Sequence, residues 1–179
     1  MKMYRCRICG ETYLGASAPS RCPFCGAAEH FMVEGDGFSG DENRVQLTEL
    51  ERDDLETAIG IERSNARFYA AMASLEHDET LASAYKRLSR VEAEHCSLFC
   101  KLLGETKPDD LAIPEGDAGG WCDAITESAA REQRAAEFYA EVVARATNAR
   151  IIEVFSAVSA IERDHLEFDV LAARRAHCE

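Results

Sequence analysis

The sequence has no long hydrophobic run and little positive charge. No apolar stretch approaches the roughly 18 residues that a membrane-spanning helix needs, and the opening MKMYRC lacks the apolar segment of a signal peptide. Lysine and arginine together number 20 against 33 acidic residues, which gives a net charge of −13. Nucleic acid binding needs clustered lysine and arginine. We therefore expect a soluble cytoplasmic protein that binds neither membrane nor nucleic acid.

A disulfide framework is also not indicated, although the chain has eight cysteines. Four of them form two Cys-x-x-Cys pairs near the N-terminus. The other four have no paired spacing and lie in sequence of helical character: Cys96, Cys100, Cys122 and Cys178. This distribution favours metal thiolates in a reducing compartment. We expect the four scattered cysteines to be small, buried apolar side chains.

The two Cys-x-x-Cys pairs predict one four-thiolate metal site. Each pair is followed by a glycine, and twelve residues separate the pairs: Cys6, Cys9, Gly10, Cys22, Cys25 and Gly26. Such knuckles can bring four thiolates around one ion, and the glycines relieve crowding where backbone amides turn toward sulfur. A segment this short cannot fold on its apolar surface alone, so the metal would be its main source of stability. The spacing by itself leaves structural zinc open beside iron.

The whole N-terminal segment resembles rubredoxin. Besides both knuckles, the matching positions are Tyr4, Tyr13, Gly15, Pro19 and Phe31. The resemblance implies an iron that cycles between ferrous and ferric states and carries one electron at a time. It favours iron over zinc in this site.

The chain changes character after this segment. The stretch GDGFSGDEN, residues 35–43, is polar and rich in glycine, as linkers are. Thr48 and Glu51 then fit a capping box that opens a helix. We expect a metal-bound module over residues 1–34, a linker over 35–47 and a helical domain over 48–179.

From Thr48 onward, apolar residues recur at spacings of three and four, which predicts helices. Breaks are expected at 76–80, at 104–120, which contains Pro108 and Pro114, and at 147–148. Four helices with short, long and short connections form two antiparallel hairpins joined by a crossover, the arrangement of ferritin-like bundles. The predicted fold class is therefore mainly α: a ferritin-like four-helix bundle preceded by a small rubredoxin-like module of strands and loops.

The two predicted hairpins repeat each other at a constant offset of seventy residues. ERSNARFYA matches EQRAAEFYA, and SRVEAEH matches SAIERDH. The paired positions are Glu62 and Glu132, Tyr69 and Tyr139, Ser89 and Ser159, Glu92 and Glu162, and His95 and His165. A constant offset through two helices and a loop indicates a duplicated hairpin.

On helical wheels, each inward face is apolar except near its middle. There every helix contributes a carboxylate and two helices add a histidine: Glu62, Glu92, His95, Glu132, Glu162 and His165. No lysine or arginine lies on these faces, so buried carboxylates would repel one another unless cations neutralise them. This is the ligand set of ferritin-like di-iron and di-manganese proteins. Residues three apart share a helix face, so Glu92 and Glu162 are expected to bridge two metals, with the other four as terminal ligands.

A rubredoxin-like module fused to such a bundle resembles rubrerythrin, in the order found in reverse rubrerythrins. The resemblance implies a non-haem peroxidase that reduces hydrogen peroxide to water, with electrons delivered by a reductase through the thiolate iron. It also implies a homodimer with the module placed across subunits. Many rubrerythrins carry an additional glutamate on the third helix, where this chain has Ala129 and Ala135. We therefore expect a more symmetric site, closer to bacterioferritin-type ligation.

Three further polar residues lie on the inward faces. Tyr69 and Tyr139 are expected either to pack in the core or to bond a ligand carboxylate. Asp169 follows His165 by four residues and is expected either to orient a ligand histidine or to sit at the end of the core.

Two other functions remain open from the sequence. The same ligands oxidise ferrous iron in ferritins, so a ferroxidase or oxygen reductase is one alternative. An electron carrier or a structural metal protein, with zinc in the front module, is the other. Zinc and manganese are possible substitutes for iron at the two sites.

Overall fold

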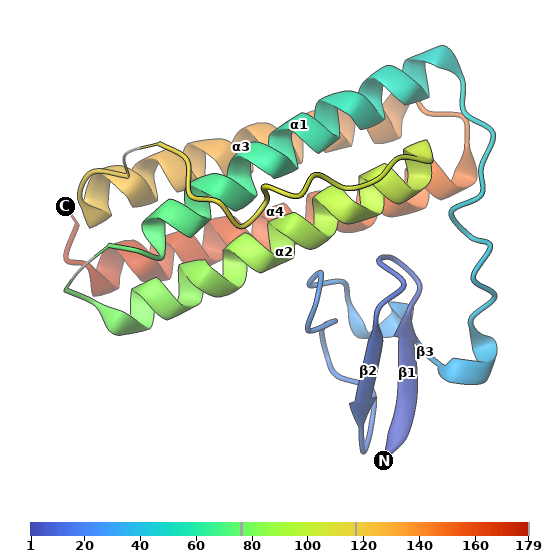
Figure 1. The fold of residues 1–179 in the computed structure, drawn as a ribbon, viewed down its shortest axis with the longest axis horizontal. Coiled ribbons are helices and arrows are strands. Elements are labelled where there is room, and N and C mark those ends of the chain that lie inside the picture. Colours follow the sequence, from blue (N-terminus) through green and yellow to red (C-terminus); the bar gives the residue numbers. More distant parts are fainter. Residues whose placement is uncertain (76, 117, 179) are drawn as a thin grey trace.

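The computed structural model describes residues 1–75, 77–116 and 118–178. It is a helical bundle with a small β module on its side (Figure 1). The described helices are α1 Glu49–Met72, α2 Glu79–Leu103, α3 Trp121–Arg145 and α4 Ala149–Arg175. They form two hairpins, and the connection from α2 to α3 runs along the bundle (Figure 1). The predicted ferritin-like fold class is confirmed. None of the described helices is both long and apolar enough to cross a bilayer.

The helix ends follow the local sequence. Thr48 accepts a hydrogen bond from the Glu51 amide at 3.2 Å, and the Glu51 carboxylate accepts one from the Thr48 amide at 2.9 Å. This is the predicted capping box. Asp78 caps α2 within the predicted break at 76–80, of which Glu76 lies outside the described residues. Gly104, at φ +83°, ends the same helix in the left-handed conformation that suits glycine.

The front module is a three-stranded antiparallel sheet with two metal knuckles. Its strands, in the order β2-β1-β3, are β1 Lys2–Cys6, β2 Thr12–Gly15 and β3 Met32–Glu34. The Gly10 amide donates to the Cys6 carbonyl at 2.8 Å, and the Gly26 amide donates to the Cys22 carbonyl at 2.9 Å. Both glycines have φ above +80°, a conformation that other residues adopt only with strain. The two knuckles are therefore built alike.

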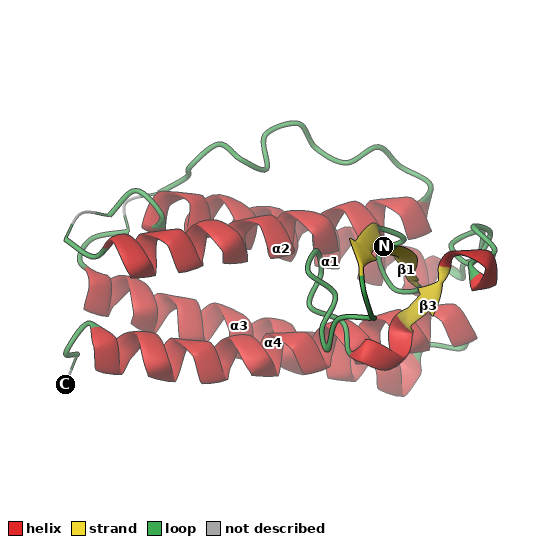
Figure 2. Cartoon of the chain, turned by 90° about the horizontal axis from the view of Figure 1, so that it is seen from below, coloured by secondary structure: helices red, strands yellow, loops and turns green. Residues whose placement is uncertain are grey.

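The module packs across α2 and α4 of its own chain (Figure 2). Lys101 on α2 donates to the Cys9 carbonyl at 3.0 Å. Arg150, at the start of α4, donates to the carbonyls of Arg7 at 2.6 Å and Ile8 at 3.1 Å. Within this chain, the module therefore docks on the bundle that follows it in the sequence.

The bundle interior has two apolar clusters with a polar layer between them. One cluster includes Phe99 and Phe155 and continues into the module, while the other includes Met72 and Tyr85. In each helix, the candidate metal ligands come between a segment of one cluster and a segment of the other. The polar layer is therefore shielded from water along the bundle axis.

The duplication of the hairpin is also visible in equivalent hydrogen bonds between its helices. Ser89 donates to the Ala66 carbonyl at 2.8 Å, and Ser159 donates to the Ala136 carbonyl at 3.0 Å. Both partners of the second bond lie seventy residues after those of the first. The repeat that the sequence predicts therefore extends to individual contacts.

Replacing Arg150 by alanine should loosen the module from the bundle. The side chain is largely buried and its guanidinium bonds two module carbonyls. Hydrogen bonds from charged groups contribute about 1.5–3 kcal/mol each, so we expect a loss of about 2 kcal/mol or more in the free energy of unfolding. Chemical denaturation would measure it. Arg174→Ala, at an exposed position, is the matched control and should change stability by less than about 0.5 kcal/mol. Equal stability of the two variants would contradict the docking role.

Candidate metal centres

The four predicted cysteines converge at the tip of the module. Cys6 Sγ lies 3.8 Å from Cys25 Sγ, and Cys9 Sγ lies 3.8 Å from Cys22 Sγ. All four sulfurs are within 4.8 Å of one another, and the side chains are buried. Four sulfurs about 2.3 Å from a tetrahedral ion would be about 3.8 Å apart. The sulfur positions therefore fit a single tetrahedral metal.

The six predicted bundle residues form two overlapping groups. One group is Glu62, Glu92, His95 and Glu162, and the other is Glu92, Glu132, Glu162 and His165. Within each group, one ligand atom from every residue lies within 4.8 Å of the others. Two residues belong to both groups, so the arrangement suits two adjacent ions that share two carboxylates.

The shared carboxylates turn one oxygen to each histidine. Glu92 Oε2 lies 3.5 Å from His95 Nδ1, and its Oε1 lies 3.2 Å from His165 Nδ1. Glu162 Oε1 lies 3.3 Å from His95 Nδ1, and its Oε2 lies 2.8 Å from His165 Nδ1. A bidentate bridge between two metals needs this division of oxygens. The geometry suits the bridging role that the sequence suggested for Glu92 and Glu162.

The unshared carboxylates are each held by a tyrosine from the other hairpin. Tyr139 donates to Glu62 Oε1 at 2.6 Å, and Tyr69 donates to Glu132 Oε1. The second oxygen of each carboxylate faces a histidine. Of the two alternatives for these tyrosines, the structure shows both at once, since each side chain is fully buried and bonds a candidate ligand. The hydroxyls fix which carboxylate oxygen is free for a metal.

Several buried atoms of the cluster have no hydrogen-bond partner. They are Glu62 Oε2, His95 Nδ1 and both carboxylate oxygens of Glu92 and Glu162. Such atoms are costly to bury unless something else binds them. All of them face the centre of the two groups, so hard, oxygen- and nitrogen-preferring metal ions fit this donor set.

Charge in the cluster is strongly perturbed. Burial raises the pKa of Glu62 and Glu132 well above its usual value, and the nearby Glu92 carboxylate raises it further. Burial alone would lower the pKa of both imidazoles, but the facing carboxylates outweigh it and raise the pKa of His95 and His165 well above its usual value. Without a metal, protons therefore occupy part of the donor set.

One histidine of the cluster also contacts the thiolate site. His95 Nε2 donates to the Cys25 carbonyl at 2.9 Å, while its Nδ1 faces the carboxylates. This bond fixes the tautomer that leaves Nδ1 free for a metal. Spacing gives no sign of this contact, because it joins residues seventy positions apart in different modules.

Two of the scattered cysteines were predicted wrongly. Cys122 and Cys178 form a disulfide, with Cα atoms 5.4 Å apart. In an antiparallel hairpin the start of the first helix meets the end of the second, and this neighbourhood could have suggested the pair. Cys96 and Cys100 are buried free thiols, as expected. The disulfide weakens the argument from cysteine usage for a reducing compartment.

Asp169 is buried and holds two hydroxyl groups. Its carboxylate accepts from Tyr85 at 2.7 Å and from Ser128 at 2.8 Å. The sequence left open whether Asp169 orients a ligand histidine or lies at the end of the core, and its hydrogen bonds are to these hydroxyl groups. Ser128 carried no signal in the sequence, since a lone serine on a helix face is ordinary.

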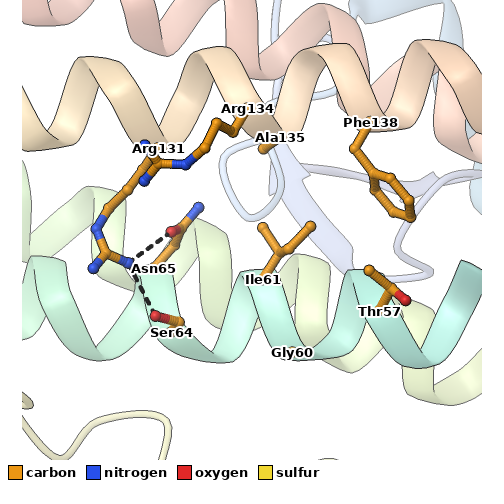
Figure 3. A pocket seen from close by; sticks show the side chains of 9 residues that line it. All are labelled: Thr57, Gly60, Ile61, Ser64, Asn65, Arg131, Arg134, Ala135 and Phe138. Atoms are coloured by element: carbon orange, nitrogen blue, oxygen red, sulfur yellow. Dashed lines mark hydrogen bonds between the residues drawn. The ribbon is translucent and has the colours of Figure 1, made fainter.

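A surface pocket of about 510 Å³ lies between α1 and α3, close to the cluster (Figure 3). Its lining includes Asn65 and Ala135, each three residues after a cluster carboxylate, Glu62 or Glu132. Arg131 reaches across and donates to Asn65 Oδ1 at 3.4 Å (Figure 3). Because position 135 carries only a methyl group, this side of the cluster has no fifth carboxylate.

The fold and the two clusters define a ferritin-like protein with a carboxylate–histidine di-metal site and a rubredoxin-like module. Family models match both parts: "Rubrerythrin, rubredoxin-like domain" matches residues 4–32, and "Rubrerythrin" matches residues 53–169. The chain belongs to the rubrerythrin family. Both clusters are consistent with the iron cofactors of that family.

The chain is also similar to reverse rubrerythrin-1 of Clostridium acetobutylicum. The two are 36% identical over 120 residues, which cover 59% of this chain and 64% of that protein. The match therefore spans less than two thirds of the curated relative. The order of the two parts is the one that the sequence resemblance indicated. No solved structure matches the chain.

Metal binding to the bundle cluster should release protons and weaken as the pH falls. The raised pKa values of Glu62, Glu132 and both histidines mean that protons compete with the metal for the same atoms. Calorimetric titration of the metal-free chain with manganese, in buffers of different ionisation enthalpy, would count the released protons. An affinity independent of pH, with no proton release, would contradict this picture of the cluster.

Proposed function

We propose that the chain is a non-haem di-iron peroxidase that reduces hydrogen peroxide to water with electrons passed through a thiolate iron. Each peroxide takes up two electrons and two protons and gives two water molecules. When bound, the iron pair supplies both electrons to the O–O bond while the carboxylates hold the ions at a fixed separation. The observation that carries the proposal is the 2.9 Å hydrogen bond between His95 and the Cys25 carbonyl, because it joins the two metal sites.

The residues have distinct roles in this proposal. Cys6, Cys9, Cys22 and Cys25 hold the electron-carrying iron. Glu92 and Glu162 would bridge the iron pair, and each iron would be held by one terminal carboxylate and one imidazole: Glu62 with His95, and Glu132 with His165. The hydrogen bonds from Tyr139 and Tyr69 orient the terminal carboxylates. The division of oxygens between the two histidines supports the bridging assignments.

The electron route lies within one chain. A ligand of the thiolate site, Cys25, is joined through its own backbone carbonyl to His95, a proposed ligand of the iron pair. The path therefore consists of one residue's covalent bonds, one hydrogen bond and one imidazole ring. A protein reductase would deliver electrons to the module. A homodimer is part of the proposal, but this route does not require a partner's module.

A visible spectrum and a metal analysis test the proposed activity. The iron-loaded chain should show ferric thiolate absorption that bleaches on reduction and returns when peroxide is added. Glu92→Ala or His165→Ala should abolish this peroxide-driven return, because either variant removes a proposed ligand of the iron pair, and the thiolate absorption itself should remain. Stopped-flow spectroscopy would follow the return.

Glu167→Ala removes an exposed carboxylate from the same helix as His165 and serves as the control, with an expected rate like that of the native chain. Full peroxide turnover in the Glu92 and His165 variants would contradict the assignment of these residues to the iron pair. A colourless module containing zinc would contradict the electron route. Oxidation of added ferrous iron without peroxide turnover would favour a ferroxidase instead.

Mixing two inactive variants tests whether electrons stay within one chain. Cys9→Ser removes a thiolate ligand and Glu92→Ala removes a bridging ligand, so neither variant should turn over peroxide. Because the route is contained in one chain, mixed dimers of the two should also be inactive. Peroxidase assays on variants unfolded and refolded together would measure this. Restored activity would mean that the module of one chain serves the bundle of another.

A further inference from the structure

A chain of hydrogen bonds leads away from the metal cluster at Glu132. Tyr69 donates to Glu132 Oε1. The Ser128 hydroxyl lies 3.4 Å from the Tyr69 hydroxyl and 2.8 Å from Asp169 Oδ2. Three side chains from α1, α3 and α4 therefore connect the cluster to Asp169 without a gap.

The outer end of this chain lies at a surface pocket. Asp169 is one of the residues that line a pocket of about 380 Å³, whose rim includes the Cys122–Cys178 disulfide. The carboxylates of the metal cluster are fully buried. The hydrogen bonds thus join a pocket that water can enter to carboxylates that are fully buried.

Only one half of the duplicated bundle has this connection. Tyr139 repeats the bond of Tyr69 to a cluster carboxylate. Seventy residues before Ser128 and Asp169, however, the chain has Ala58 and Phe99, both fully buried and apolar. The related half therefore packs without polar groups at these positions. Asp169 also accepts from the buried Tyr85 hydroxyl, so what sets this half apart is Ser128, which contacts both Asp169 and Tyr69.

We propose that Asp169, Ser128 and Tyr69 form a proton path from the surface pocket to Glu132. The inference rests on the proposed function, which consumes two protons for each peroxide at a site whose carboxylates are fully buried. As members of a proton path, these three residues have a role that the geometry of the metal ligands does not give them.

Each step of the path moves one proton and leaves the hydroxyls unchanged. The Asp169 carboxylic acid gives its proton to Ser128 Oγ, Ser128 gives its own to the Tyr69 oxygen, and Tyr69 gives its own to Glu132 Oε1. At Ser128 and Tyr69 one O–H bond breaks as another forms, and Glu132 Oε1 holds the delivered proton until peroxide reduction consumes it. Tyr69 and Ser128 each have both neighbours within reach, so rotation of the two hydroxyls resets the path. Asp169 takes its next proton from water in the pocket.

Asp169 is suited to exchange protons near neutral pH. Burial raises its pKa to about 6, although hydrogen bonds from its two hydroxyl partners and the charge of His165 act in the other direction. The serine hydroxyl is the group that faces it from α3. The titratable groups near Asp169 are Tyr69 on α1, Tyr85 and Glu92 on α2, and His165 on its own helix, α4.

Ser128→Ala breaks the path without touching a proposed metal ligand. Ser159→Ala is the matched control, because Ser159 is also a buried serine but donates to a backbone carbonyl outside the path. In the iron-loaded chain, we expect Ser128→Ala to slow peroxide-driven reoxidation by about 10²-fold, the usual size of a lost proton-transfer contribution. Its solvent deuterium isotope effect should increase. Ser159→Ala should match the native chain, and Ser128→Thr, which keeps the hydroxyl, should restore most of the rate.

A readout independent of turnover comes from infrared spectroscopy. The native chain should show a carbonyl band of a buried carboxylic acid that titrates near pH 6. Asp169→Asn should remove this band and also the dependence of the reoxidation rate on pH in that range. Far-ultraviolet circular dichroism would report whether the helical bundle of each variant has folded.

The outcomes separate the path from the proposed function. If the native iron-loaded chain is not reoxidised by peroxide, the proposed function is wrong. The proposed proton path then has no reaction to supply and is overturned as well. If the native chain reacts but Ser128→Ala or Asp169→Asn keeps the native rate and pH profile, the path alone is overturned. Loss of rate in Ser128→Ala with no recovery in Ser128→Thr and an unchanged isotope effect would indicate a packing role and also overturn it.

Discussion

The rest of the structure depends on four carboxylates that are buried within a few ångströms of one another. Charges removed from water are stable only when opposite charge and hydrogen bonds compensate them. Among the described residues, the positive partners recorded for these carboxylates are the two cluster imidazoles. Two cations resolve the imbalance, and the apolar clusters on both sides keep water from competing for them. The bundle therefore surrounds negative charge that its own side chains do not neutralise.

The same constraint explains how the module is attached. A metal-binding histidine needs its second ring nitrogen held so that the first points at the metal. For His95 the holding group is the Cys25 carbonyl, which belongs to the thiolate site. Docking the module therefore completes the bundle cluster, and the contact that orients a ligand is also the contact between the two centres. Arg150 and Lys101 secure this arrangement at the edges by bonding other module carbonyls.

Much of this could be predicted from the sequence, and what could not has a common cause. Periodicity and the seventy-residue repeat correctly predict the bundle and bring the six candidate ligands together. The capping box at Thr48 was also readable, since it is local. Spacing along one helix gives the face of a residue but not its partner across the bundle. For that reason the crossed partners of the two tyrosines and the pairing of Ser128 with Asp169 became visible only in three dimensions, whereas the meeting ends of the second hairpin could have suggested the Cys122–Cys178 disulfide.

The duplication predicts a symmetric site, and for the proposed ligands the geometry is symmetric. The surroundings are not. The group that contains His95 touches the thiolate module, which is the proposed source of electrons. The group that contains Glu132 is joined to Asp169 at the surface pocket, the proposed source of protons. Electrons and protons would then arrive at different members of the metal pair, each by its own route. The two hairpins supply similar half-sites, and differences outside the ligand set, Ala58 against Ser128 and Phe99 against Asp169, would give them separate tasks.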